Sequence, residues 1–173
     1  MRLTSTITEY DPTWTSAYQA EAGRIAPLIG ENLVSLHHVG STAIAGLAAK
    51  PEIDILVEVK KVLDYSRVLG GLGYRRGNDL SPGHQFYKKD VGGVRTHKVH
   101  VCVANHVTAE EMKRFLEILT RDSALRREYQ QLKYALEASN THGIAEYLAG
   151  KAPFVRRVLN TGGSLGGNGA PDA

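Results

Sequence analysis

Two carboxylates and a glycine–serine turn are the first residues in this chain whose types and spacing could do chemistry. Glu52 and Asp54 lie two positions apart in the run EIDILVEV, the clearest strand pattern in the sequence. Because alternate residues of a strand point to one face, both carboxylates lie close enough to share a divalent metal ion. The triplet Gly40-Ser41-Thr42 ends an earlier strand pattern, and its backbone N–H groups and hydroxyls could bind phosphate. A phosphate-binding turn beside a metal-binding strand indicates metal-dependent nucleotidyl transfer.

The predicted strand 94–103 carries two histidines and several bases. His97 and His100 are three positions apart, so they face opposite sides of a regular strand, and His100 shares its face with Lys98. Between residues 75 and 98, six Lys and Arg residues outweigh two Asp residues, and this excess could meet a polyphosphate.

Both groups of residues also have plainer interpretations. The first is a tight turn followed by a strand with a solvent-facing acidic stripe, because such short motifs arise by chance. The second is a pair of histidines that pack or hydrogen-bond within a sheet whose basic face is solvated. Spacing alone leaves these alternatives open.

Composition narrows the class of protein. The 173 residues have a net charge of only +3, whereas a nucleic-acid-binding domain carries a clustered basic surface, so nucleic acid is not an expected partner. Cys102 is the single cysteine and cannot form an internal disulfide, which predicts a cytoplasmic location. No apolar run approaches the length of a membrane span and no secretory signal is visible, so we expect no membrane partner. The oligomeric state is left open.

The elements that must position these residues follow from periodicity and from glycine and proline breaks. An amphipathic helix is expected at 12–29 and a helical turn at 42–49. Helical spacing also covers 60–70 and most of the chain from 108 to 158. Strands are expected at 33–39, 52–59, 73–77, 84–90 and 94–103. This order predicts an α+β (mixed α/β) protein, with a mixed β-sheet flanked by helices and a helical C-terminal part.

Taken together, these stretches resemble the GrpB family, a small branch of the nucleotidyltransferase superfamily that includes DNA polymerase β. The resemblance covers about residues 9–159. Its main runs are YDPTW at 10–14, HVGSTA at 38–43, GLAAKP at 46–51, IDI at 53–55 and RTH at 95–97. It implies a nucleotidyltransferase-like fold, with a GrpB-like domain at 1–160. The glycine-rich tail at 161–173 is predicted to be disordered.

The resemblance also implies roles for individual residues, with ATP or another NTP as substrate and Mg²⁺ or Mn²⁺ as cofactor. Glu52, Asp54 and His100 are the implied catalytic residues and metal ligands, with His100 acting alternatively as a general base. Lys98 stands where family members carry a histidine. The implied nucleotide-binding residues are Gly40, Ser41, Thr42, Lys50, Arg95 and His97.

Three functions remain open on this basis. The first is transfer of a nucleotidyl group to a small-molecule acceptor, and the second is adenylation of a carboxylate by an ATP-dependent ligase. Both begin at the α-phosphate of the nucleotide, so the motif does not separate them. The third is a non-catalytic nucleotide-binding module. A role on RNA is disfavoured because 173 residues leave no room for a separate RNA-binding domain.

Overall fold

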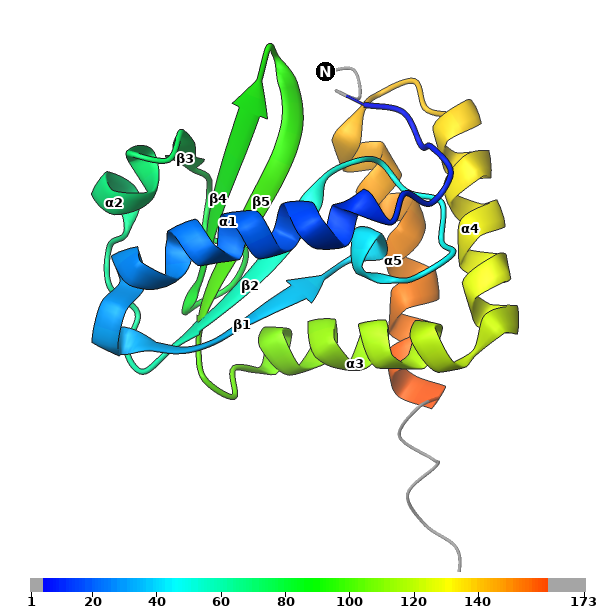
Figure 1. Ribbon diagram of the computed structural model, residues 1–173. Coiled ribbons are helices and arrows are strands. Elements are labelled where there is room, and N and C mark those ends of the chain that lie inside the picture. The colour runs from blue at the N-terminus through cyan, green and yellow to red at the C-terminus, as the bar shows by residue number, and fades with distance from the viewer. Residues whose placement is uncertain (1–4, 162–173) are drawn as a thin grey trace, which may run out of the picture.

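A five-stranded mixed sheet forms the centre of the structure, a computed structural model that describes residues 5–161 (Figure 1). The strand order is β1-β2-β5-β4-β3, in which β2 and β5 are parallel and the other neighbours are antiparallel. The strands are β1 (Leu33–Val39), β2 (Ile53–Val59), β3 (Tyr74–Arg76), β4 (His84–Val91) and β5 (Val94–Val103). The predicted α+β class, with a mixed sheet flanked by helices, is confirmed.

Five α-helices and two short 3₁₀ helices complete the described part of the chain. Helix α1 crosses one face of the sheet, α3 runs beside β1, and α4 and α5 lie beyond the end of that strand (Figure 1). Their bounds are α1 (Thr13–Ile29), η1 (Gly30–Asn32), η2 (Ser41–Ala43), α2 (Ser66–Gly70), α3 (Val107–Arg121), α4 (Ser123–Ala138) and α5 (Ile144–Thr161). All of the predicted tail after residue 161 lies outside the described residues.

The helix predicted at 60–70 is wrong in length, because only α2 forms there. The Asn32 side chain accepts the Lys61 N–H at 3.1 Å and donates to the Lys61 carbonyl at 2.6 Å. These bonds hold the backbone of this segment outside a helix. Asp64 then accepts the Ser66 N–H at 2.9 Å, an interaction that favours a helix start at this point.

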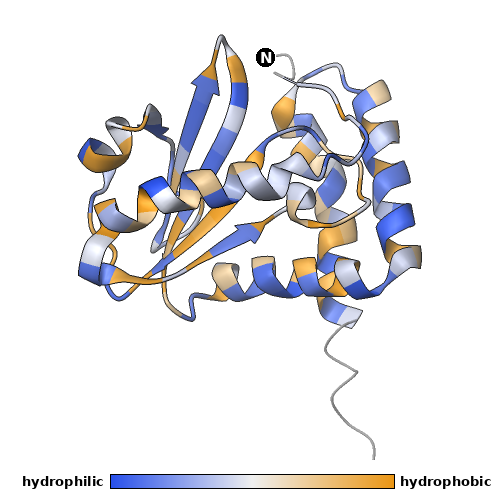
Figure 2. Cartoon of the chain, viewed as in Figure 1, coloured by the Kyte–Doolittle hydropathy of each residue, from blue (hydrophilic) through white to orange (hydrophobic). Residues whose placement is uncertain are grey.

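The two faces of the sheet are covered differently. Helix α1 buries Trp14 and Ile25 against the face that presents Ile55, Val57 and Val99. On the opposite face, α3 covers only the end that presents residues such as Leu56. Figure 2 shows that the hairpin of β4 and β5, which projects past the helices, is largely hydrophilic.

A second apolar cluster joins the segment after η2 to the helical third of the chain. Ile44 and Leu47 are buried against Leu119, Tyr129 and Phe154, which come from α3, α4 and α5 in turn. The turn after β1 is therefore fixed between the sheet and these helices. This packing positions the glycine turn over the strand that carries the carboxylates.

Candidate functional site

Parallel pairing of β2 and β5 places the predicted carboxylates and one histidine on the same face of the sheet. Asp54 is in register with Lys98. The Lys98 ammonium lies 2.7 Å from Glu52 Oε2 and 3.6 Å from Asp54 Oδ1. His100 Nε2 lies 3.6 Å from the same Asp54 oxygen. The three predicted residues thus lie side by side, and Lys98 bridges the two carboxylates.

The glycine turn lies directly against Asp54. Gly40 has a φ of +73°, and a Cβ atom placed on it would meet Asp54 Oδ2 at 2.6 Å. No side chain fits at this position, and L-residues rarely adopt this backbone conformation. Glycine is therefore required both by the turn and by the close approach of the carboxylate. The adjacent Ser41 interacts with the buried Tyr129 of α4.

The Asp54 carboxylate is held in its charged form. Burial alone would raise its pKa, but the Lys98 ammonium and His100 outweigh burial and lower the pKa of Asp54 to about 2. Burial likewise acts to lower the pKa of Lys98, and the Asp54 and Glu52 carboxylates outweigh it and raise that pKa. At neutral pH the site therefore holds an ionised acid and an ionised base in contact.

Two further lysines and a tyrosine border this ion pair. The Lys50 ammonium lies 4.2 Å from the centre of the Tyr147 ring, and the Lys151 ammonium lies 4.7 Å from it. Burial, together with the positive charge of Lys98, lowers the pKa of Lys151 to about 8. Lys50 was predicted from the sequence, whereas Lys151 and Tyr147 were not assigned to the site.

Two of the predicted nucleotide-binding side chains, those of His97 and Thr42, lie away from Asp54. His97 projects to the face covered by α1, where the Glu21 carboxylate and the Lys89 ammonium surround it. Thr42 is buried, and its hydroxyl donates to the Glu52 carbonyl at 3.3 Å. The same hydroxyl oxygen lies 3.0 Å from His38 Nε2. Neither side chain reaches the face that carries Asp54.

Arg95 lies on the correct strand but has another partner. Its guanidinium forms an ion pair with Asp90, which also pairs with Arg75 at 2.5 Å. The positive charge of Arg95 reaches Lys98 and counts among the influences on its pKa. Arg95 thus contributes to the potential of the site, while its side chain is engaged at the hairpin end of β4 and β5.

The predicted metal ligands do not fit a bound divalent cation in this arrangement. A metal ion shared by Glu52 and Asp54 would lie between their oxygens, where the Lys98 ammonium already lies. Within residues 5–161, no group of three or more His, Cys, Asp or Glu side chains is arranged to hold a metal ion. We therefore derive no chemical step through a metal.

His84 of β4 is a site residue that sequence reasoning missed. Its Nε2 lies 2.9 Å from His100 Nδ1, and the His84 side chain is buried. The Asp54 carboxylate favours a proton on His100 Nε2, so in the neutral ring Nδ1 accepts the proton of His84. Burial first, and then nearby His100, lower the pKa of His84 to about 4, which keeps His84 neutral. His84 thereby orients the ring that faces Asp54.

Lys133 of α4 anchors the segment that follows the glycine turn. It is 2% exposed, and its ammonium donates to the Ala48 carbonyl. Burial, with the charge of Lys151 as a smaller cause, lowers the pKa of Lys133 from 10.5 to about 7. Because the pKa of Lys133 differs between the folded and unfolded states, the free energy of unfolding depends on pH.

The free energy of unfolding should rise between pH 7 and pH 9 because of Lys133. Above its folded pKa of about 7 this lysine loses its proton in the folded state, whereas the unfolded chain keeps it up to about 10.5. The unfolded state then binds more protons, so stability increases with pH by at most about 1.4 kcal/mol per pH unit. Denaturant unfolding at several pH values measures this slope. Lys133→Met should reduce it and the exposed-site control Lys60→Met should not; equal slopes in all three proteins would contradict the assignment.

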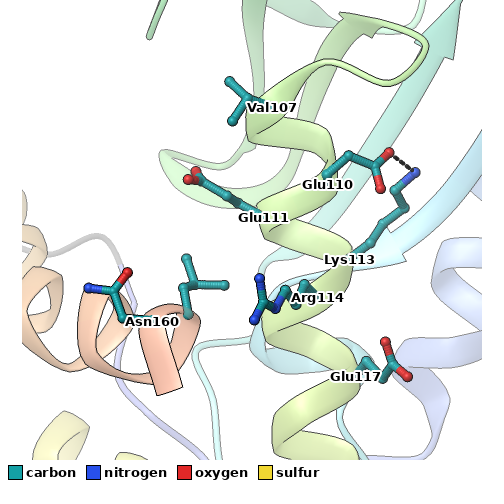
Figure 3. Close-up of a pocket in the computed structure, with 8 residues that line it drawn as sticks. Val107, Glu110, Glu111, Lys113, Arg114, Glu117 and Asn160 are labelled. Atoms are coloured by element: carbon teal, nitrogen blue, oxygen red, sulfur yellow. Dashed lines mark ion pairs between the residues drawn. The ribbon is translucent and has the colours of Figure 1, made fainter. Parts of the chain in front are cut away.

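One surface groove lies away from these residues. It has a volume of about 710 Å³ and separates α3 from the end of α5 (Figure 3). Charged side chains of α3 dominate its lining, and Glu110 and Lys113 form an ion pair of 2.6 Å there. None of the residues predicted from the sequence lines this groove. None of the helices described is long and apolar enough to cross a membrane.

The fold and the site define an α+β protein in which a glycine turn packs against a carboxylate strand. The chain belongs to the GrpB family, because the sequence profile described as GrpB protein matches residues 4–161. The predicted family is therefore confirmed.

Individual relatives agree with this assignment. The UPF0157 protein YqkA of Bacillus subtilis is 30% identical over 151 residues, which make up 85% of this chain and 44% of YqkA. This chain thus spans less than half the length of that relative. A UPF0157 protein of Halalkalibacterium halodurans is 31% identical over 89% of this chain and 80% of its own length. The crystal structure of the conserved protein GrpB from Enterococcus faecalis matches with a TM-score of 0.82 and 28% identity, covering 90% of this chain and 96% of that one.

Proposed function

We propose that this chain is a nucleotidyltransferase-type enzyme that binds ATP or another NTP across the Gly40 turn and the face of β2 and β5. The observation that carries the proposal is the ionised pair of Asp54 and Lys98, with Lys50 and Lys151 beside it. Lysine ammonium groups bind phosphate as point charges, and three of them meet here. Gly40 and Ser41 bring the backbone of the turn to the same place.

The proposed reaction transfers a nucleotidyl group to a small-molecule acceptor. An acceptor hydroxyl or amine attacks the α-phosphorus, and a new bond forms between the acceptor atom and that phosphorus. The bond from the α-phosphorus to the bridging oxygen breaks, and pyrophosphate leaves with the electron pair. Asp54 takes the proton of the acceptor, and His100 Nε2 lies 3.6 Å from the carboxylate that receives it. The lysines balance the charge that collects on the phosphate oxygens.

The ligase alternative shares this first step. A carboxylate acceptor would form an acyl adenylate, and an amine would then displace AMP from it. The site favours neither acceptor, because the residues described above surround the phosphates. A panel containing alcohols, amines and carboxylates distinguishes the two, since only the ligase releases AMP in an amine-dependent second step.

Calorimetry and a pyrophosphate-release assay test the proposal together. ATP should bind the wild-type chain, and pyrophosphate should appear when the correct acceptor is present. Lys151→Met should weaken ATP binding by about tenfold, which is the typical value of one modest charge interaction. Lys61→Met, at an exposed position far from the site, is the matched control. Absence of ATP binding would refute the proposal, whereas binding without turnover across the whole panel would favour the non-catalytic module.

A further inference from the structure

We propose that the Lys98 ammonium takes the place of a divalent cation between Glu52 and Asp54, so that this face binds phosphate esters without a resident metal ion. The inference has two parts. The first concerns the two carboxylates and the cation between them, and it depends on the structure alone. The second concerns phosphate binding, and it rests on the proposed function.

The position of Lys98 is the first argument. Its Nζ atom lies 2.7 Å from Glu52 Oε2, the length of a strong charge-assisted hydrogen bond, and 3.6 Å from Asp54 Oδ1. The side chain is 25% exposed, and the carboxylates on either side are less exposed than that. Lys98 therefore lies at the mouth of the carboxylate pair, and a metal ion could enter only by displacing it.

Charge balance is the second argument. Glu52 and Asp54 supply two negative charges, and Lys98 neutralises one of them. Lys50 and Lys151 lie close enough to influence one another, and both interact with Glu52. Three ammonium groups thus surround two carboxylates. A divalent cation added to this set would be repelled, whereas an added phosphate would be attracted.

The state of His100 is the third argument. A metal ligand needs a free lone pair on a ring nitrogen. His100 Nδ1 is occupied by His84 Nε2 at 2.9 Å, and His100 Nε2 lies 3.6 Å from Asp54 Oδ1. A metal ion at Nε2 would replace the Asp54 contact, and Nδ1 would then have to donate a proton to His84, where it now accepts one. Metal binding would therefore cost one contact and reverse another.

Lys98 is also equipped to hold phosphate. An ammonium group has three N–H donors; the 2.7 Å contact with Glu52 uses one, and Asp54 Oδ1 lies at 3.6 Å. At least one donor therefore remains for an oxygen of a phosphate on the exposed side of the site. A single lysine would thus order the carboxylates and bind the substrate, two roles that a metal ion combines in other enzymes.

Binding of Mn²⁺ tests the first part directly, and it requires no nucleotide. Binding of Mn²⁺ to protein reduces the electron paramagnetic resonance signal of the free ion. Addition of the wild-type protein should leave this signal unchanged. Lys98→Met should bind Mn²⁺ about 100-fold more tightly, because it removes a positive charge that lies 2.7 Å from Glu52 Oε2 and 3.6 Å from Asp54 Oδ1. Lys98→Arg should show no gain. Lys61→Met, which removes an exposed charge far from this face, is the control.

Nuclear magnetic resonance of the wild-type protein keeps the inference testable if Lys98→Met does not fold. Mn²⁺ broadens the signals of nearby nuclei, so the Glu52, Asp54 and His100 signals should stay sharp. Selective broadening of these signals in wild type would overturn the inference, as would a well-folded Lys98→Met protein that gains no Mn²⁺ binding.

Binding of inorganic triphosphate tests the second part. The affinity of the wild-type protein for triphosphate should differ by less than about twofold between buffer with EDTA and buffer with Mg²⁺. This comparison is made after correction for the Mg²⁺ that triphosphate binds in solution. Triphosphate binding that requires Mg²⁺ would overturn the inference. Failure of triphosphate to bind under either condition would refute the proposed function instead, and the Mn²⁺ result would still decide the first part.

Discussion

Asp54→Asn should lower the rate of nucleotidyl transfer by about 10²- to 10⁴-fold, the usual contribution of a positioned general base. The amide cannot accept the acceptor's proton, and it no longer pairs with the Lys98 ammonium. Nucleotide affinity should move in the opposite direction. Removing a negative charge from a site with three lysines leaves a larger excess of positive charge for the phosphates. The pyrophosphate assay measures the rate, and calorimetry measures the affinity.

The opposite signs of these two effects separate a catalytic role from a structural one. A merely structural residue would lower rate and affinity together, in step with the midpoint of thermal unfolding. Asp79→Asn, which alters an exposed carboxylate paired with Arg76, is the control and should change neither quantity. Turnover of Asp54→Asn at the wild-type rate would remove Asp54 from the reaction.

Gly40→Ala should lower the free energy of unfolding by about 2–6 kcal/mol. A non-glycine residue in the Gly40 backbone conformation costs roughly 1–3 kcal/mol, and forcing an extra methyl into a packed site costs a further 1–3 kcal/mol or so. The new Cβ would meet Asp54 Oδ2 at 2.6 Å, so the carboxylate would have to move. Denaturant unfolding measures the loss of stability.

Gly46→Ala is the matched control for this substitution. Gly46 has a φ of +75°, close to the +73° of Gly40, but a Cβ placed there meets nothing within 4 Å. It should cost only the backbone penalty of roughly 1–3 kcal/mol. The difference between the two variants isolates the contact with Asp54. Equal losses in both would show that this contact contributes nothing.

Much of the fold could be predicted because the local pattern and the tertiary environment agree. The strands predicted at 52–59 and 94–103 form as β2 and β5, with side chains that point alternately to the two faces of the sheet. Both strands are paired on each side, within the sheet. The helix predicted at 12–29 forms as α1 because its apolar residues meet the sheet. The segment 60–70 differs because Asn32, far away in sequence, holds its backbone.

The site could be predicted only in part, because its composition depends on long-range pairing. Alternation along one strand places His97 and His100 on opposite faces, and the structure agrees. The bridge formed by Lys98 requires the parallel register of β2 with β5, which neither strand specifies alone. Lys151 and Tyr147 belong to α5, which lies far from β2 and β5 in the sequence. Their helical spacing is typical of core packing and carries no signal of a site.

A titration of isotope-labelled protein with ATP, followed by nuclear magnetic resonance, tests the central claim most directly. The claim is that phosphate binds between the Gly40 turn and the lysines beside Asp54. The account predicts that the largest backbone amide shifts occur at Gly40, Ser41 and residues 98–100, with and without Mg²⁺. Shifts confined to the groove between α3 and the end of α5, or no shifts at all, would contradict it.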